Sequence, residues 1–344
     1  MKEVWLPKAK EIIIKDMPKP VLQEDGMALI RIELCGICGS DITAYQGTNP
    51  TLTYPIQGLG HEGVGVIEEV GDNDKGLKAG DRVVLEPYVP CNQCHMCKVK
   101  RFNNCENLRV CGTHKNGMMA EHFLHPVSLT YKIPESLDFR RAALVEPLTI
   151  GLHALTRSRV KRGEFCVIFG AGTIGLLASF SCLSYGATPI LIDVVKRRLD
   201  RAKELGIKHT YNSAGSTEDK IEEYLREVCG GVLPDAMLEC TGSPAVIGSM
   251  HEMVRHGGSI SLVGWPHDPV TVNTIRCMRK ELDIHGSRNS LGKFPEAIEL
   301  VNKGAVPVNE IISKVIKPEE VDTTIQDIIK NPSDYVKVLV TMRE

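Results

Sequence analysis

Four cysteines lie close together in the sequence and could hold a metal ion. They follow the pattern Cys91-x2-Cys94-x2-Cys97-x7-Cys105. Four thiolates on one short segment can close a tetrahedral zinc site, which leaves no coordination position open, so we expect a structural role. An iron–sulfur cluster is the alternative, but the last spacing and the residue after Cys105 do not match the pattern typical of such clusters. We therefore predict a structural zinc lobe over about residues 88–108.

A glycine-rich segment further along the chain has the spacing of a dinucleotide-binding turn. Gly170, Gly172 and Gly175 follow the pattern G-x-G-x-x-G, after an apolar run and before a helical pattern. The first glycine permits a tight turn, the second lets the backbone approach a pyrophosphate, and the third allows close packing of helix on strand. The helix would begin at Thr173 and Ile174, with its N-terminus facing the phosphates.

Asp193 ends the next apolar run and predicts which dinucleotide is bound. An acidic side chain at this point accepts hydrogen bonds from the ribose hydroxyls and repels a 2′-phosphate, which favours NAD over NADP. Arg198 could stack beside the adenine, although a phosphate role for it would weaken that preference. Further candidates for cofactor contact are Val263, Gly264 and Ser287.

Three other segments carry residue types that bind catalytic metals. They contain Cys38, the pair His61 and Glu62, and Glu146. Each has an ordinary structural explanation when taken singly: a core thiol, a surface pair and a turn before proline. Spacing alone cannot join segments that lie so far apart.

The elements around these residues change in kind along the chain. Residues 1–147 carry short strand patterns and no helical pattern of useful length, which indicates an all-β, barrel-like unit; the strand patterns are 28–34, 64–70 and 82–85. From about residue 160, apolar strands alternate with amphipathic helices, which predicts βαβ units and a parallel sheet. The strands are 165–169, 189–193, 236–240 and 259–263, and the helices are 173–185, 196–205, 219–229 and 245–255. After about residue 283 we expect one more helix, 295–302, and a terminal strand, 335–342.

In this order, the motifs resemble those of the zinc-dependent medium-chain dehydrogenase/reductase family over essentially the whole chain. They are GICGSD at 36–41, GHE at 60–62, the four-cysteine lobe, Glu146-Pro147, GAGTIG at 170–175 and the strand-end Asp193. The resemblance implies an α/β protein of two domains. A GroES-like β-barrel catalytic domain would comprise residues 1–147 and 284–344, and a doubly wound parallel-sheet Rossmann domain would comprise 148–283.

The resemblance also implies a catalytic metal site and hence two zinc ions per subunit. Cys38 and His61 would hold the catalytic zinc, Glu62 would be a ligand or its neighbour, and Glu146 would bind directly or through water. Such a site keeps a position open, where zinc lowers the pKa of a bound alcohol and favours hydride transfer to NAD. Ser40 would begin a proton relay to solvent. Many members of the family end that relay with histidine where this chain has Thr43, so the exit route stays open.

The segments 144–148 and 151–153 resemble the sorbitol dehydrogenase branch. Motifs at 86–88, 112–114, 255–258 and 286–289 are most similar to L-galactonate and L-gulonate 5-dehydrogenases. We expect Arg288 to bind a sugar-acid carboxylate or a hydroxyl pair through its guanidinium fork, with a surface ion pair as the alternative. Other expected substrate contacts are Tyr45, His114 and Asn289. Galactitol-phosphate, sorbitol and L-threonine 3-dehydrogenases remain alternatives, as does a catalytically silent sensor that binds zinc and NAD.

Composition limits the classes of partner. The chain has 344 residues, 42% hydrophobic and 24% charged, with a net charge of −2, which is typical of a soluble protein of two domains. Nucleic acid and anionic membranes normally require a basic face, so neither is expected, and a small-molecule substrate is. The apolar cluster Ile12–Ile14 is too short for a signal peptide, so we expect a cytoplasmic protein. The family resemblance also implies that the protein forms a homodimer or homotetramer.

Overall fold

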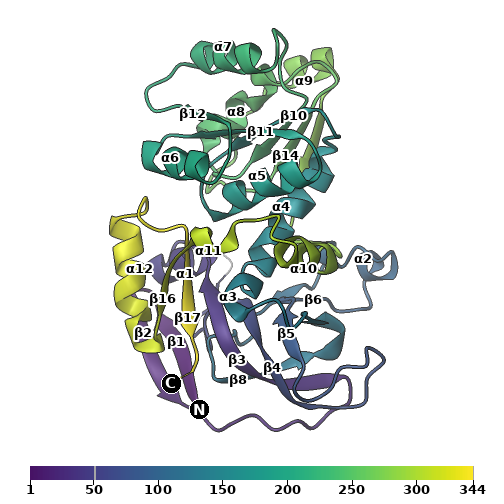
Figure 1. Ribbon diagram of the computed structural model, residues 1–344, viewed down its shortest axis with the longest axis vertical. Helices are drawn as coiled ribbons and strands as arrows, with labels where there is room; N and C mark the ends of the chain where they lie inside the picture. Colours follow the sequence, from purple (N-terminus) through teal and green to yellow (C-terminus); the bar gives the residue numbers. More distant parts are fainter. Residues whose placement is uncertain (50–51, 344) are drawn as a thin grey trace. The chain divides into compact units, whose positions relative to one another are not determined.

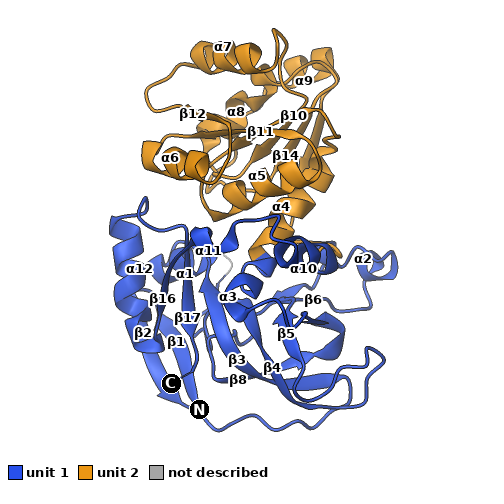
Figure 2. Cartoon of the chain, in the orientation of Figure 1, with its two compact units in different colours: residues 1–146, 294–344 blue, residues 147–293 orange. Residues whose placement is uncertain are grey.

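The computed structural model describes residues 1–49 and 52–343, which fold as two compact units. Unit 1 comprises Met1–Glu146 and Phe294–Glu344, and unit 2 comprises Pro147–Lys293 (Figure 2). The second boundary lies later than the expected residue 284. The reason is that β15 (Asp283–Gly286) pairs in parallel with β14 of unit 2.

Unit 2 contains a parallel sheet in the order β12-β11-β10-β13-β14-β15. Counted along the chain, this is the strand order of a dinucleotide-binding doubly wound sheet, whose ligand crevice lies at the carboxyl ends of the two central strands. The predicted parallel sheet is thereby confirmed. Its other strands are β10 (Phe165–Phe169), β11 (Thr188–Asp193), β12 (His209–Asn212), β13 (Ala236–Glu239) and β14 (Ser259–Leu262).

Helices cover both faces of this sheet. Helices α5 and α6 lie on one face, and α7 and α8 lie on the other (Figure 1). α6 buries Leu199 and Ala202, and α7 buries Ile221 and Leu225; this spacing of three to four residues places each pair on one helix face. The helices are α5 (Thr173–Ser184), α6 (Lys196–Glu204), α7 (Glu218–Val228), α8 (Pro244–Met253) and α9 (Thr274–Lys280).

Unit 1 is built on a mostly antiparallel sheet in the order β16-β17-β3-β4-β5-β9, with β8 also pairing β3. The strands are β3 (Met27–Ile37), β4 (Glu62–Val70), β5 (Arg82–Leu85), β8 (His122–Pro126), β9 (Thr130–Lys132), β16 (Ile312–Ile316) and β17 (Lys337–Thr341). Aliphatic side chains such as Ile30, Ile67 and Val340 form its core. Because β17 pairs with β3, the last segment of the chain returns to this unit, as the family resemblance implied.

Two small hairpin-like pairs complete the β-structure of unit 1. β1 (Lys2–Lys8) pairs with β2 (Glu11–Asp16), and β6 (Tyr88–Val89) pairs with β7 (Arg109–Val110). The second pair encloses the cysteine-rich segment, so that segment leaves and re-enters the unit at adjacent points.

The expectation that residues 1–147 lack a useful helix was wrong. Helix α1 (Gly39–Gln46) follows β3 directly and ends at Gly47, whose φ of 75° requires a left-handed conformation. The helix is short and its polar residues hide the pattern, since it buries only Asp41, Ala44 and Tyr45. The shorter α2 (His95–Lys98) and α3 (Phe139–Ala142) also lie in this part, and α4 (Val145–Ser158) begins near its end.

The C-terminal part also has more elements than expected. Besides α10 (Phe294–Asn302), it contains α11 (Val308–Ile311), β16 and α12 (Val321–Lys330). The apolar spacing Val321, Ile325, Ile328 is typical of an amphipathic helix and is a signal that the sequence interpretation missed.

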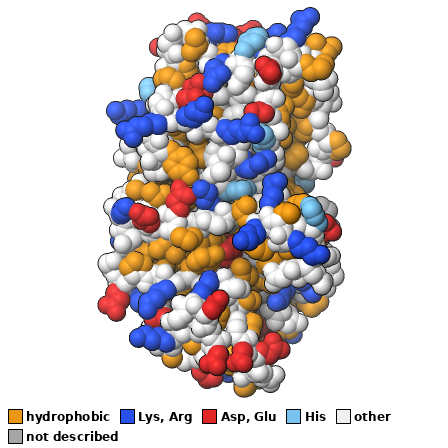
Figure 3. Space-filling model, turned by 90° about the vertical axis from the view of Figure 1, so that its right-hand side faces the viewer, with side chains coloured by type: hydrophobic (Ala, Val, Ile, Leu, Met, Phe, Trp, Pro, Cys, Tyr) orange, Lys and Arg blue, Asp and Glu red, His pale blue; other side chains and the backbone are white. Residues whose placement is uncertain are grey.

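Charged side chains of both signs are scattered over the face drawn in Figure 3, in keeping with the small net charge of −2. Among the described residues, none of the helices combines the length and apolarity needed to cross a bilayer.

Candidate functional site

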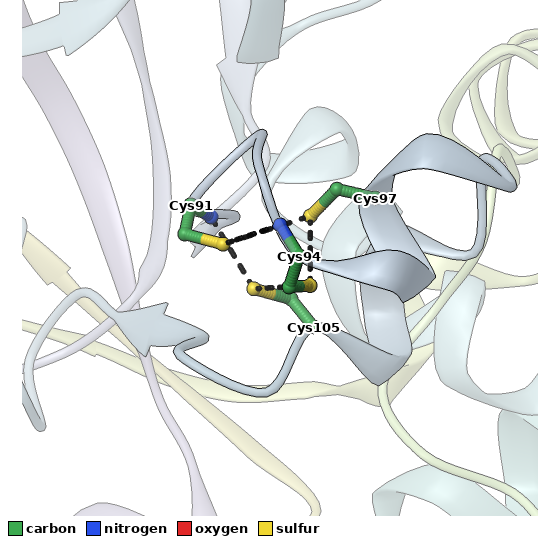
Figure 4. Close-up of side chains that lie close together, drawn as sticks. All are labelled: Cys91, Cys94, Cys97 and Cys105. Atoms are coloured by element: carbon green, nitrogen blue, oxygen red, sulfur yellow. Dashed lines mark hydrogen bonds between the residues drawn. The ribbon is translucent and has the colours of Figure 1, made fainter.

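The four predicted lobe cysteines converge on one point (Figure 4). Cys94 directly precedes α2 and Cys97 lies within it, Cys91 comes earlier in the chain, and Cys105 follows a short 3-10 turn. The Sγ–Sγ separations are 3.5 Å for Cys94–Cys97, 3.9 Å for Cys94–Cys105 and 4.0 Å for Cys91–Cys97. Zinc bonded to four sulfurs at about 2.3 Å would hold them about 3.8 Å apart, so the geometry fits a closed zinc site.

The electrostatics of the lobe also suit a cation. Backbone N–H groups of Gln93 and Cys94 lower the pKa of the Cys91 thiol to about 6, and those of Glu106 and Cys97 lower the pKa of Cys94. Burial and the neighbouring thiols raise the pKa of Cys97 to about 12, because crowded thiolates repel one another. A bound cation relieves that repulsion.

A second cluster brings together distant segments of unit 1. Donor atoms of Cys38, His61 and Glu62 all lie within 4.8 Å of one another. Cys38 precedes α1, while His61 and Glu62 stand at the start of β4, which pairs with the end of β3. One thiolate, one imidazole and one carboxylate form the mixed donor set of a catalytic zinc site.

Asp41 orients this cluster. Its Oδ2 accepts a 2.8 Å hydrogen bond from the Cys38 backbone N–H, and its Oδ1 lies 3.9 Å from Nδ1 of His61. That Nδ1 is buried and has no hydrogen-bond partner among the described residues. Histidines that bind metals commonly direct the second ring nitrogen at a carboxylate, which fixes the ring.

Lys337 holds Glu62 in place. Its Nζ donates to both carboxylate oxygens of Glu62 at 2.6 Å and to the carbonyl oxygen of Ile37 at 3.0 Å. The two side chains are 2% and 0% exposed, so the ion pair is fully removed from solvent. Burial lowers the pKa of Lys337, but the charges of Glu62, Cys38 and Glu146 and the hydrogen bond to Glu62 together outweigh it and raise the pKa.

Glu146, near the start of α4, is buried and accepts a hydrogen bond of 2.5 Å from the hydroxyl of Tyr88 on β6. Glu146 is not part of the three-residue group. Burial raises the pKa of its carboxyl to about 7, and the nearby charge of Glu62 adds to the effect.

The charge balance of the cluster favours a divalent cation. Asp41, Glu62 and Glu146 are buried beside the Cys38 thiol, with Lys337 as their buried ammonium partner. Burial raises the pKa values of both Asp41 and Glu146, because their carboxylates lose hydration there, and a cation beside them would stabilise the charged forms. A zinc ion would supply it, and the residues present therefore fit the metal.

In unit 2, the glycine turn has the geometry that its sequence predicts. Gly170 has φ of +99°, which permits the turn after β10. A Cβ on Gly175 would lie 1.7 Å from the carbonyl oxygen of Gly170, so only glycine allows this approach. A Cβ on Gly172 would meet nothing within 4 Å, which leaves open space over the N-terminus of α5, where Thr173 and Ile174 begin the helix. This space suits a pyrophosphate.

Asp193 lies at the end of β11 beside that turn. Its Oδ2 accepts from the Ala171 N–H at 2.6 Å, its Oδ1 accepts from the Val195 N–H at 2.7 Å, and Arg198 approaches to 3.7 Å. Val263 and Gly264 follow β14 and donate backbone N–H groups to the carbonyl of Glu239. Ser287 follows β15, and its buried Oγ has no hydrogen-bond partner in the described part of the chain.

The expected substrate residues fall into different surroundings. Tyr45 is 4% exposed and accepts a hydrogen bond from Gln326 of α12, so it packs in the core of unit 1. His114 lines a cavity of unit 1. Arg288 is exposed, and Asn289 has a left-handed φ of 52°. Ser40 is half-buried, and the Thr43 hydroxyl donates to its carbonyl oxygen.

Sequence reasoning missed Asp41, Tyr88 and Lys337 as site residues. Asp41 belongs to the motif that contains Cys38, so only its role was overlooked. Lys337 had one signal, because it is a charged residue inside an apolar strand run. Tyr88 belongs to the motif at 86–88, but its role was overlooked, since its partner is 58 residues away.

Comparisons with known proteins agree with this geometry. Residues 24–135 match the family model "Alcohol dehydrogenase GroES-like domain", and residues 173–303 match "Zinc-binding dehydrogenase". An uncharacterized zinc-type alcohol dehydrogenase-like protein of Haemophilus influenzae is 42% identical over 98% of both chains. Sorbitol dehydrogenase 1 of Saccharomyces cerevisiae is 31% identical over 98% of this chain and 97% of its own.

Solved structures give the same result. An alcohol dehydrogenase of Escherichia coli in complex with NADH has a TM-score of 0.92 and 28% identity, over 99% of each chain. The expected fold, a GroES-like domain with a Rossmann domain, is therefore confirmed. The chain is an oxidoreductase and belongs to the zinc-dependent medium-chain dehydrogenase family, among its polyol and alcohol dehydrogenases.

Proposed function

We propose that the protein transfers hydride between NAD and a secondary alcohol of a polyol or sugar acid, such as L-gulonate or L-galactonate. The observation that carries this proposal is the buried group of Cys38, His61 and Glu62, with donor atoms within 4.8 Å. Its mixed donors differ from the four thiolates of the lobe, and such a set leaves a coordination position for substrate.

The residues around the open metal site have distinct tasks. Cys38, His61 and Glu62 would hold a catalytic zinc ion, while Cys91, Cys94, Cys97 and Cys105 would hold a structural one. When bound, zinc supplies Lewis-acid chemistry that lowers the pKa of the alcohol, and the dinucleotide accepts the hydride. Lys337 holds the Glu62 carboxylate through both oxygens, and Tyr88 holds Glu146. These pairs keep the carboxylates from moving as the substrate enters.

Glu146 would complete the site by binding zinc directly or through a water molecule. Its buried carboxylate accepts a hydrogen bond from the Tyr88 hydroxyl at Oε1, and it stands outside the three-residue group. Ser40 receives the proton of the alcohol. The Thr43 hydroxyl donates to the Ser40 carbonyl oxygen, so we propose that the proton leaves Ser40 by another group.

For the cofactor, we propose NAD rather than NADP. The Asp193 carboxylate stands where a 2′-phosphate would be repelled, and its two oxygens keep lone pairs for ribose hydroxyls. Arg198 would lie beside the adenine. The pyrophosphate would be positioned by Gly170, Gly172 and Gly175. The remainder of the dinucleotide would be contacted by Val263, Gly264 and Ser287.

For the substrate, we propose that Arg288 and Asn289 bind a carboxylate or a pair of hydroxyls and that His114 contributes a hydrogen bond. The core position of Tyr45 supports a packing role instead of substrate contact. Alternatives are another alcohol of the family, namely galactitol phosphate, sorbitol or L-threonine, and a silent sensor. The family also leads us to propose a homodimer or homotetramer in the cytoplasm.

A substrate panel tests the proposal. NAD and NADP reduction is measured with L-gulonate, L-galactonate, D-sorbitol, galactitol 1-phosphate and L-threonine, for the zinc-loaded wild type and for His61→Ala. We expect NAD-linked turnover of a sugar acid or polyol that His61→Ala abolishes. Preferred turnover of L-threonine would contradict the substrate class. Binding of NADH without turnover of any alcohol would favour the silent sensor.

A further inference from the structure

Unit 1 contains a cavity of about 590 Å³, and the permanently charged side chains that line it are all positive. The volume falls within the range of small-molecule sites. Arg109 and Lys115 are the permanently charged lining residues, and no aspartate or glutamate lines the cavity. Among the described residues, neither cation forms an ion pair with a carboxylate, unlike the Lys132–Asp81 pair of the same unit.

The cations stand on a rigid turn. The carbonyl oxygen of Val110 accepts N–H bonds from Thr113, His114 and Lys115, and the Gly112 N–H donates back to the Lys115 carbonyl oxygen. Arg109 donates to the carbonyl oxygen of His114 at 3.1 Å. These bonds fix the backbone of the turn and the guanidinium of Arg109, while the exposed Lys115 side chain stands on that fixed backbone, so a ligand would not have to order a flexible loop.

The rest of the lining suits a hydroxylated chain. The Val110 N–H donates to Nδ1 of His114 at 3.1 Å, which assigns the proton of the neutral imidazole to Nε2 as a donor. Gln57, Asn107 and Asn116 add amide groups, while Ile56 and Leu108 supply apolar surface. Amides and an imidazole can bond several hydroxyl groups, and the cations can bind one oxyanion.

The cavity also adjoins the segment that carries His61. Gln57 lines it and precedes His61 by four residues, so their Cα atoms lie at most about 14 Å apart. Another lining residue, Thr113, follows Gly112, whose added Cβ would lie 2.6 Å from the carbonyl oxygen of Gly60. Gly60 is the residue directly before His61. The lining therefore lies beside the segment that carries His61, and a polyol with its oxyanion in the cavity would extend toward that segment.

We propose that this cavity binds the oxyanion group of a polyol substrate, a carboxylate or a phosphate, through Arg109 and Lys115. The inference rests on the proposed function and narrows its substrate class to anionic polyols. It assigns the hydroxyl pair, rather than the carboxylate, to Arg288. The neighbouring zinc lobe gives these cations one competing role, as counter-charges of its thiolates, and the test must separate the two.

The first test compares substrates of different charge. KM and kcat are measured with L-gulonate, galactitol 1-phosphate and D-sorbitol for wild type, Arg109→Gln, Lys115→Gln and the double variant. We expect KM for an anionic substrate to rise about 3-fold in each single variant and about 10-fold in the double variant, with kcat retained. KM for D-sorbitol should change less than about 2-fold. The anion with the larger effect identifies the group as carboxylate or phosphate.

Two control variants sharpen this result. Arg101→Gln removes an exposed arginine that does not line the cavity, and it should leave all KM values unchanged. Arg288→Lys should weaken the binding of anionic and of neutral polyols equally. If the Arg109/Lys115 double variant raised KM for D-sorbitol as much as KM for the anionic substrates, the inference would be overturned.

A second test does not require turnover. Binding of inorganic phosphate and of L-gulonate to the zinc-loaded protein without NAD is measured by calorimetry, and zinc content is measured in the same samples. Binding by the wild type that the double variant loses at unchanged zinc content supports the inference, even if no alcohol of the panel is oxidised. Equal binding by both proteins, or loss of lobe zinc in the double variant, would overturn it.

Discussion

The two metal clusters of unit 1 differ in how the chain builds them. The lobe cysteines lie within one short segment, from Cys91 to Cys105, and present four like donors. The open cluster joins Cys38, His61 and Glu62 with a lysine from the last strand, 275 residues from its partner. The lobe can form from local turns, whereas the open cluster requires the whole β-sheet of unit 1 to be in place.

Charge distinguishes the clusters as well. The lobe is made of thiols, two of which backbone N–H groups already favour as thiolates. The open cluster surrounds its donors with further carboxylates, which His61 and the buried Lys337 partly offset. A closed set of like ligands suits a permanent ion, while a mixed set held by neighbouring groups suits an ion that must also bind substrate.

The β6–β7 pair connects the cysteine lobe with the open cluster. Tyr88 of β6 donates to Glu146, and Arg109 of β7 lines the cationic cavity. The same two strands lead into and out of the lobe, so a zinc ion there would fix the positions of both residues.

The largest expected effect comes from removing a donor of the open cluster. Cys38→Ser should lower kcat/KM about 1000-fold or more, since several kcal/mol of Lewis-acid stabilisation are lost. Zinc content should fall by one ion per subunit, because the lobe is untouched. Cys277→Ser, at a half-buried cysteine outside both clusters, should match the wild type. Full activity in Cys38→Ser would refute the distinction between the clusters.

The next effect concerns the buried ion pair. Lys337→Met leaves the Glu62 carboxylate buried without its partner and should lower the free energy of unfolding of the zinc-free protein by about 3–5 kcal/mol. Chemical denaturation measures this, and Lys337→Arg should retain much of the stability. Adding Glu62→Gln to Lys337→Met should restore stability but not activity. If Lys337→Met were as stable as the wild type, the ion pair would not hold the site.

The lobe should affect stability more than chemistry. Cys97→Ser should release the lobe zinc and lower Tm, because a structural zinc site contributes directly to folding free energy. We expect kcat/KM to fall only about 10-fold, through loosening of Tyr88 and Glu146. A loss as large as that of Cys38→Ser, with the open site still loaded, would mean that the lobe is part of the catalytic site.

The smallest effect tests the link between the clusters. Tyr88→Phe removes one hydrogen bond to the Glu146 carboxylate and should lower kcat/KM about 10-fold, with zinc content unchanged. Tyr131→Phe is the matched control, because Tyr131 donates to Glu86 in the same unit at 2.7 Å without contacting either cluster. Equal effects of the two substitutions would show that Tyr88 acts only through folding.

The sequence predicted those parts of the site whose residues lie close together along the chain. The glycine turn, Asp193 and the four-cysteine spacing each lie within one or two adjacent elements, and their patterns indicated both element and chemistry. The open cluster could be joined only through family resemblance, because strand pairing brings Cys38 and His61 together. Lys337 and Tyr88 were missed for the same reason. Helix α1 was missed because three buried residues in a polar octapeptide give no clear period, and β15 because Asp283–Gly286 is mostly exposed.

The most direct test of the account is to follow zinc content and NAD-linked turnover together while a chelator removes metal from the wild type. We predict that turnover disappears as the first ion leaves, that the remaining ion per subunit stays in the cysteine lobe, and that added zinc restores activity. Turnover that persists with only the lobe ion bound would contradict the account.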